Sequence, residues 1–155
     1  MKLTIIAAAV IAILLVLGIG TFSKVKKVSP IGWGWYGTVN ATDGIALGGY
    51  DAVSYQSGTP TQGAEANTFT YQGATWRFAN ADNKAAFEAD PAKYAPQFGG
   101  FCGFAASKGF TAHTDPTVFE LKDGKLYVFA DADMRTNWLG DAGAIAAGNA
   151  GWVKR

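Results

Sequence analysis

The chain has 155 residues, of which 49% are hydrophobic, so its length and composition allow one domain of ordinary size with a substantial core. The net charge of +1 hides an asymmetry, because four of the 13 basic residues and none of the 12 acidic residues lie in the first 27 positions. The rest of the chain carries nine basic and twelve acidic side chains, and this acidic balance without a basic stripe argues against a nucleic-acid partner.

An uncharged hydrophobic run occupies residues 3–22. As a helix that rises about 1.5 Å per residue, this run would span about 30 Å, which is the thickness of a bilayer hydrocarbon core. A cleaved signal peptide would have a shorter apolar stretch and a small-x-small cleavage site, and the alanines at residues 7–9 come too early to provide one. We therefore expect a transmembrane anchor over residues 1–22, with a signal peptide as the alternative.

Lysines flank both ends of this run, at Lys2 on one side and at Lys24, Lys26 and Lys27 on the other. By the positive-inside rule, this near balance slightly favours a cytoplasmic domain. Three aromatic residues follow, and they fit either the membrane interface or one edge of the domain core: Trp33, Trp35 and Tyr36.

Residues 23–45 are expected to form a linker, because Gly, Pro and Ser interrupt every hydrophobic period. Within it, residues 32–37 match G-x-G-x-x-G. No strand precedes this match and no helix follows it, so it does not indicate a nucleotide-binding loop. The folded domain is expected over residues 46–155.

Two β-hairpins are predicted in this domain. Residues 67–78 alternate apolar and polar side chains around a Gln72-Gly73 turn, which would pair Phe69 with Trp76. Residues 118–129 do the same around Asp123-Gly124, a strong signal for a type I′ turn. The inward face of this second hairpin is expected to carry Phe119, Leu121, Leu126 and Val128, with Tyr127 beside the charged residues of the other face.

Short helices are predicted around these hairpins. Asn80 would cap a helix over residues 81–89, and Asp90-Pro91 would start a further turn. Residues 131–139 and 141–147 indicate an interrupted C-terminal helical region. The fold class is therefore α+β: a small domain of two antiparallel hairpins with short helices on one side, preceded by one transmembrane helix.

Four stretches of this sequence resemble the YHS-domain family, in its stand-alone form found in exported and membrane-anchored bacterial proteins. They are GYDAVSY at residues 49–55, YQGATWRFA at 71–79, FEADPAKYAPQFGGFC at 87–102 and DGKLY at 123–127. The resemblance covers about residues 46–139. It implies a metal-binding or metal-sensing role, although metal-associated relatives usually carry several cysteines and this chain has one. It also implies an extracytoplasmic location, whereas the flanking lysines slightly favour a cytoplasmic one.

Cys102 is the only cysteine, which excludes an intramolecular disulfide and a CxxC site. It is either a soft metal ligand or redox thiol, or a small buried hydrophobe. His113 is the only histidine, and it is either a ligand or a solvated loop residue. A closed metal site needs three or four ligands, so Asp51 or Asp115 would have to contribute, with turn capping as the alternative role of Asp51. The chain has only two methionines, which argues against a thioether copper site.

A ligand pocket near these residues would involve Tyr50, Tyr55 and Phe101, although the aromatic residues of this region also fit a core. The expected function is a membrane-tethered accessory domain that binds a transition-metal ion or a small ligand near Cys102. Two alternatives stay open: an interaction module without a ligand, presented to a partner protein in the membrane, and a thiol-dependent redox protein. No catalytic residue is assigned.

Overall fold

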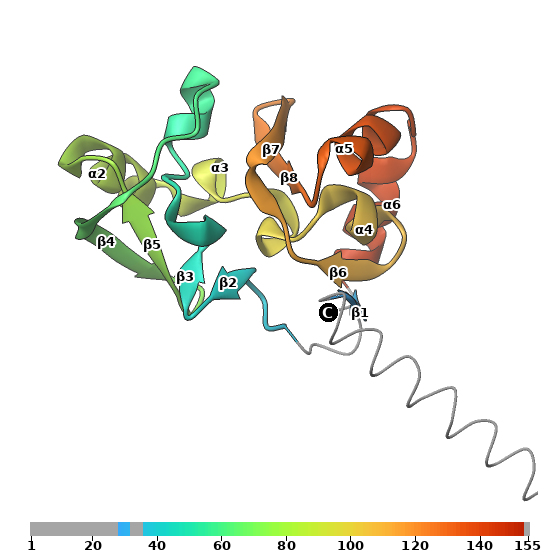
Figure 1. The fold of residues 1–155 in the computed structure, drawn as a ribbon, viewed down its shortest axis with the longest axis horizontal. Coiled ribbons are helices and arrows are strands. Elements are labelled where there is room, and N and C mark those ends of the chain that lie inside the picture. The colour runs from blue at the N-terminus through green and yellow to red at the C-terminus, as the bar shows by residue number, and fades with distance from the viewer. Residues whose placement is uncertain (1–27, 32–35, 154–155) are drawn as a thin grey trace, which may run out of the picture.

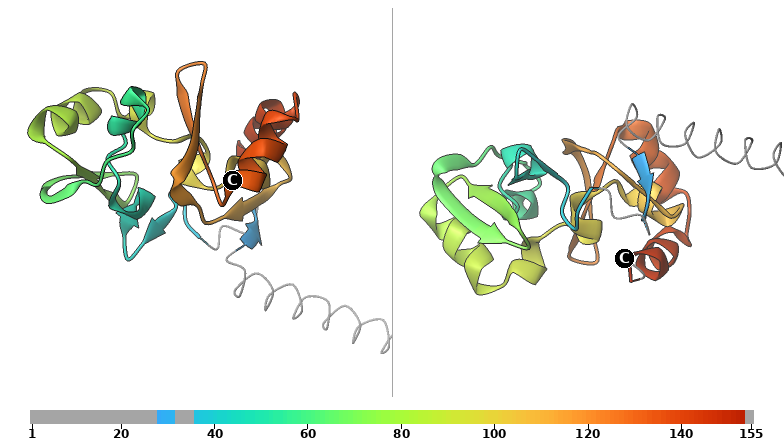
Figure 2. Two further views of the ribbon diagram at one scale, coloured as in Figure 1. Left: turned by 45° about the horizontal axis from the view of Figure 1, so that its top comes forward. Right: turned by 90° about the horizontal axis from the view of Figure 1, so that it is seen from below.

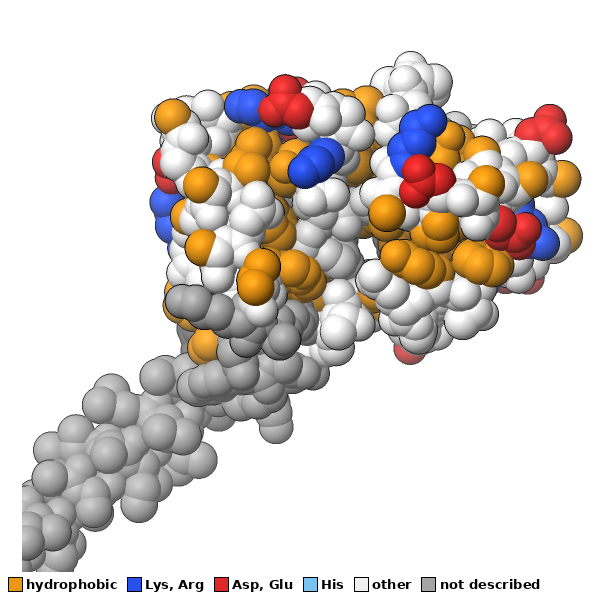
Figure 3. All heavy atoms as spheres, turned by 180° about the vertical axis from the view of Figure 1, so that it is seen from behind, with side chains coloured by type: hydrophobic (Ala, Val, Ile, Leu, Met, Phe, Trp, Pro, Cys, Tyr) orange, Lys and Arg blue, Asp and Glu red, His pale blue; other side chains and the backbone are white. Residues whose placement is uncertain are grey.

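The computed structural model describes residues 28–31 and 36–153, which form two lobes (Figures 1 and 2). Each lobe has its own hydrophobic core. Helices and β-sheets occur in both, so the predicted α+β class is confirmed. Seen from behind, charged side chains lie along the upper rim, and hydrophobic side chains gather on the face of each lobe (Figure 3).

The first lobe contains a four-stranded sheet of order β2-β3-β5-β4. Its strands are β2 (Ala41–Thr42), β3 (Ile45–Ala46), β4 (Ala64–Tyr71) and β5 (Ala74–Phe78). β4 and β5 pair through the predicted turn and place Phe69 opposite Trp76. Gln72 and Gly73 have φ angles of 50° and 77°, as a type I′ turn requires. The first predicted hairpin is therefore confirmed.

Two helices follow, α2 (Ala81–Ala89) and α3 (Pro91–Tyr94). Both begin at the predicted caps, where the side chains of Asn80 and Asp90 accept the backbone N–H three residues on, at 2.8 and 3.2 Å. Phe87 is the buried residue of α2. Its ring contacts four aromatic residues of the sheet: Phe69, Tyr71, Trp76 and Phe78.

The second hairpin joins β7 (Asp115–Lys122) to β8 (Lys125–Phe129). Phe119 pairs with Val128, and Asp123 and Gly124 have φ angles of 53° and 72°, so this prediction is also confirmed.

Strand β8 lies between the two cores. Leu126 and Val128 belong to the first core, as predicted for the inward face, whereas Tyr127 and Phe129 belong to the second core. All four side chains are at most 2% exposed. The expectation that Tyr127 faces outward with the charged residues is therefore wrong, because a second layer of helices covers that face of the strand.

This second layer consists of α4 (Gly103–Ser107), α5 (Ala132–Leu139) and α6 (Ala144–Trp152). The Asp131 carboxylate caps α5 by accepting from Met134 N at 2.8 Å. Trp138 of α5 packs its ring 4.7 Å from that of Tyr127 and 5.3 Å from that of Phe129. The C-terminal helical region was thus predicted correctly in kind, but its second helix begins and ends later than expected.

Much of the expected linker belongs to the fold. Strand β1 (Val28–Pro30) pairs antiparallel with β6 (Phe110–Ala112). Asn40 is buried, and its Nδ2 donates to Gly100 O and to Thr114 Oγ1, at 2.9 Å each. Residues 28–31 and 36–45 are therefore no linker, because long-range pairing fixes a segment that shows no local period.

The hydrophobic run at residues 3–22 lies outside the described residues, as do Trp33 and Trp35. Within residues 28–31 and 36–153, no helix is long and apolar enough to cross a membrane. Tyr36 is half-buried, and its ring packs edge-on against that of His113, with centroids 5.3 Å apart. This contact agrees with the interpretation in which Tyr36 covers one edge of the domain core.

Candidate functional site

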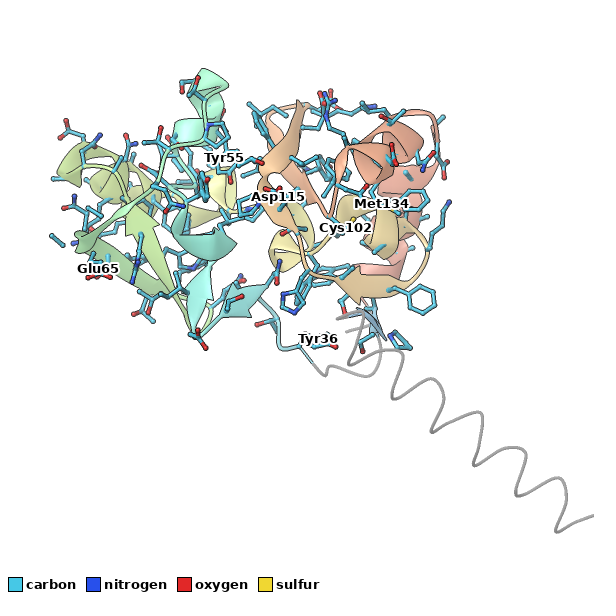
Figure 4. All side chains as sticks on the ribbon, in the orientation of Figure 1. Tyr36, Tyr55, Glu65, Cys102, Asp115 and Met134 are labelled. Atoms are coloured by element: carbon cyan, nitrogen blue, oxygen red, sulfur yellow. The ribbon has the colours of Figure 1, made fainter. Side chains whose placement is uncertain are left out.

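Cys102 is held at the junction of three elements. It follows the 3-10 helix Gln97–Gly100, in which Phe98, Gly99 and Gly100 all have positive φ angles, so the chain bends sharply before it. Its N–H donates to Ala112 O of β6 at 3.0 Å, and its carbonyl accepts from Ala106 N of α4 at 2.9 Å. The residue is 1% exposed and lies in the second core (Figure 4).

The hydrogen bond to Ala112 also places His113, which is the next residue along the chain. The imidazole ring packs near Phe101, with centroids 6.2 Å apart. Although Cys102 and His113 are separated by ten residues in the sequence, they line the same cavity of about 510 Å³. The two strongest sequence candidates are therefore brought together.

The walls of this Cys102 cavity are mainly apolar and include Phe104, Phe110, Ala112 and Ala130. Ligand sites of this kind combine an apolar lining with a few placed polar groups. Here the polar groups come from Cys102, His113, Lys108 and Asp131.

Met134 contributes a thioether to the same cavity, a residue that the sequence analysis did not select. It is placed by the first turn of α5, where the Asp131 carboxylate caps the helix. The label in Figure 4 shows it in the same lobe as Cys102. No local pattern marks Met134, because it meets Cys102 only when α5 packs against α4.

Asp51 does not belong to this cavity. Its Oδ1 accepts from Val53 N at 2.8 Å, and its Oδ2 accepts from Ala79 N at 2.9 Å and from Asn83 Nδ2 at 2.6 Å. Ser54 N donates a longer bond of 3.4 Å to Oδ1. The carboxylate thus accepts four hydrogen bonds, which is about its full capacity. The expected metal ligand is thus corrected to a buried turn residue that joins the 3-10 helix Ser54–Ser57 to the start of α2.

The expected pocket residues also serve as packing groups. Tyr55 and Phe101 have no exposed surface, and Tyr50 packs against the first core. Phe101 instead packs its ring against Trp152, with centroids 6.1 Å apart. These three residues do not form a shared ligand pocket, because aromatic side chains at these positions fill the space within and between the lobes.

Tyr55 links the lobes through its hydroxyl, which donates to Pro116 O at 2.8 Å (Figure 4). Burial, together with the nearby Tyr50, Asp115 and Asp51, raises the pKa of this hydroxyl. The folded state therefore retains the proton to higher pH than the unfolded state. The resulting stability is fully present below the ordinary value of about 10 and is lost as the pH rises above it.

We expect Tyr55→Phe to lower the free energy of unfolding by about 1 kcal/mol at pH 7, because the bond to Pro116 O is lost. Its stability should also fall less steeply above pH 10 than that of the wild type. Urea unfolding of residues 23–155 at several pH values measures both effects. Tyr71→Phe, which removes an exposed hydroxyl, is the control, and parallel alkaline curves for Tyr55→Phe and the wild type would contradict the assignment.

Among residues 28–31 and 36–153, no group of three or more His, Cys, Asp or Glu side chains is placed to hold a metal ion. The Cys102 cavity instead offers one thiol, one imidazole and one thioether. Thiolate and thioether ligands favour soft ions such as Cu(I), and imidazole accepts several transition metals. The donor set therefore suits a soft ion and lacks the four ligands of a structural zinc site.

Comparison of this chain with protein-family models, with curated proteins and with solved structures found no match.

Proposed function

We propose that this protein is a membrane-anchored accessory domain that binds a soft transition-metal ion in the Cys102 cavity. The observation that carries the proposal is that Cys102 and His113, the only cysteine and the only histidine of the chain, line one cavity. The resemblance to the YHS-domain family, on the stretches given above, supports a metal-handling role. When bound, the ion would take the Cys102 thiolate and the His113 imidazole as ligands, with the Met134 thioether as the third donor.

The surroundings of the cavity suit storage or transfer of an ion better than thiol chemistry. Reactive cysteines lie in partly exposed, electropositive surroundings, whereas Cys102 is 1% exposed. The walls of the cavity are mainly apolar, and the hydrophobic shell around a metal site controls its solvent access and local dielectric. This burial is why we favour a binding domain over the alternative of a thiol-dependent redox protein.

The test is elemental analysis of a purified protein of residues 23–155, expressed with copper supplied and kept reduced. Residues 23–155 include β1, which pairs with β6. A shorter fragment without β1 would lose this pairing. We expect about one ion per chain in the wild type and background levels in Cys102→Ser, because thiolate ligation is lost.

Ala106→Ser is the matched control for this experiment, because Ala106 is buried in the adjoining helix α4 and the substitution leaves the thiol in place. It should keep the ion. Circular dichroism confirms that each variant is folded. A folded wild type without metal above background would contradict the proposal and would favour the interaction module.

We further propose that residues 3–22 anchor the domain and that the domain lies on the extracytoplasmic side. The length and lack of charge of this run support the anchor, and the family resemblance supports the side. Reporter enzymes fused to the C-terminus test on which side of the membrane the domain lies. If only a reporter that works in the cytoplasm is active, the domain is cytoplasmic and this proposal is wrong.

A further inference from the structure

Three segments meet at the end of the molecule where the chain enters the fold. β1 pairs with β6, and Ile31 N donates to Gly109 O at 2.9 Å. The last turn of α6 packs on the same residue, because a Cβ added to Gly151 would lie 3.5 Å from Ile31 Cδ1. We call this the proximal end: residues 28–31, 103–113 and 144–153. Figures 1 and 2 show β1 beside β6 at the edge of the second lobe.

Charge is distributed very unevenly between the proximal end and the rest of the domain. These segments and the residues that adjoin them in the sequence, 23–27 and 154–155, contain six basic residues and no acidic residue: Lys24, Lys26, Lys27, Lys108, Lys154 and Arg155. All 12 acidic residues of the chain lie elsewhere. One of them, Asp141, reaches back to form a 2.9 Å salt bridge with Lys108. The other five basic residues belong to the two chain ends that continue from β1 and α6.

Hydrophobic side chains are exposed at the same end. Phe110 of β6 is 42% exposed, and Val153, the residue after α6, is 86% exposed. Apolar side chains surrounded by basic residues are the combination by which proteins bind anionic lipid surfaces.

The chain length keeps this end close to a bilayer if residues 3–22 span it. Six peptide units join Phe22 to Val28, and fully extended they reach about 20–22 Å. The headgroup region takes up about 5–8 Å of that distance on each side. β1 therefore starts within reach of the headgroups, and β6 is hydrogen-bonded directly to it.

We propose that the proximal end docks on the anionic surface of the membrane, with Phe110 and Val153 entering the headgroup region, and that the basic residues next to it in the sequence supply the charge that attracts it to lipid phosphates. This inference rests on the anchor proposed above, but it does not depend on the metal site. It sets the orientation of the domain, because docking on β1 and β6 turns the Phe110 side of the Cys102 cavity toward the bilayer.

The experiment uses the full chain in lipid vesicles, with an environment-sensitive fluorophore on a single introduced cysteine in the Cys102→Ser background. Phe110→Cys and Val153→Cys report on the proximal end from two independent positions. Ala85→Cys is the control, because Ala85 is exposed on α2 in the other lobe. Vesicles contain phosphatidylcholine alone or with 30% phosphatidylglycerol, together with nitroxide-labelled lipid as quencher.

In the anionic vesicles we expect quenching at residues 110 and 153 to exceed that at residue 85 by at least twofold. In neutral vesicles, and in 1 M salt, where the Debye length falls to about 3 Å, this difference should shrink. Equal quenching at all three positions, in chains that float with the vesicles, would overturn the docking and leave the anchor intact.

The remaining outcomes separate docking from anchoring. Flotation with anionic but not neutral vesicles would support docking and contradict the anchor. Failure to float with either kind of vesicle would overturn both. Quenching at residue 153 without residue 110 would overturn the contact through β6.

Discussion

Asp51→Ala is expected to destabilise the domain by about 3–4 kcal/mol. The substitution removes a fully buried carboxylate and leaves three donors without their partner: the N–H groups of Val53 and Ala79 and the Asn83 amide. Each buried donor left without a partner costs about 1–3 kcal/mol. Because small domains are stable by only about 5–15 kcal/mol, this change removes a large share of the total.

Urea unfolding of residues 23–155 measures this loss, and Asp131→Ala is the matched control. Asp131 is exposed and makes a single capping bond to Met134 N, so its removal should cost about 1 kcal/mol. Asp51→Asn distinguishes the structural role from metal ligation, because a folded Asp51→Asn protein should keep its metal. Similar losses for Asp51→Ala and Asp131→Ala would show that the buried network contributes little.

Local features of the fold were predictable from the sequence. The turns at Gln72-Gly73 and Asp123-Gly124 fix the register of their hairpins, and the alternation of side chains on each side agrees with them. The caps at Asn80 and Asp90 act within three residues. In each case, the residues that determine the structure are neighbours in the chain.

Long-range features were not predictable in this way. Thr111 Oγ1 donates to Ser29 O across 82 positions, within a strand pair whose first member has only three residues. Such a short segment shows no period, so nothing in its sequence separates it from a linker. The two-sided burial of β8 was missed for a similar reason, because its second face is covered by α4, which precedes it in the chain, and by α5, which follows it.

The candidate site shows the same division. Cys102 and His113 were identifiable as the only residues of their types, but their meeting depends on the Cys102–Ala112 hydrogen bond. Asp51 was selected for its chemistry, yet its partners Ala79 and Asn83 lie about 30 positions away. Residue type indicates what a side chain can do, and only the tertiary contacts decide which of its roles is used.

Gly99→Ala is expected to cost about 3 kcal/mol or more, because two effects add. Gly99 has a φ angle of +60°, a conformation that costs an alanine about 1 kcal/mol. An added Cβ would also lie only 2.0 Å from the backbone oxygen of Thr38. Relief requires the backbone to move, which strains the 2.8 Å hydrogen bond from Asn40 N to Gly99 O.

Gly58→Ala separates the two effects. Gly58 has a similar φ angle of +77°, and nothing lies within 4 Å of an added Cβ, so only the conformational cost of about 1 kcal/mol should appear. The bend at Gly99 is also confined on its other side, where α6 approaches so closely that a Cβ at Gly148 would lie 2.6 Å from Phe98 Cζ. Because this bend leads directly into Cys102, Gly99→Ala should reduce binding of the metal ion that we propose as well as the stability, whereas Gly58→Ala should leave that binding unchanged. Equal losses of stability in the two variants would mean that the contact with Thr38 does not constrain the bend.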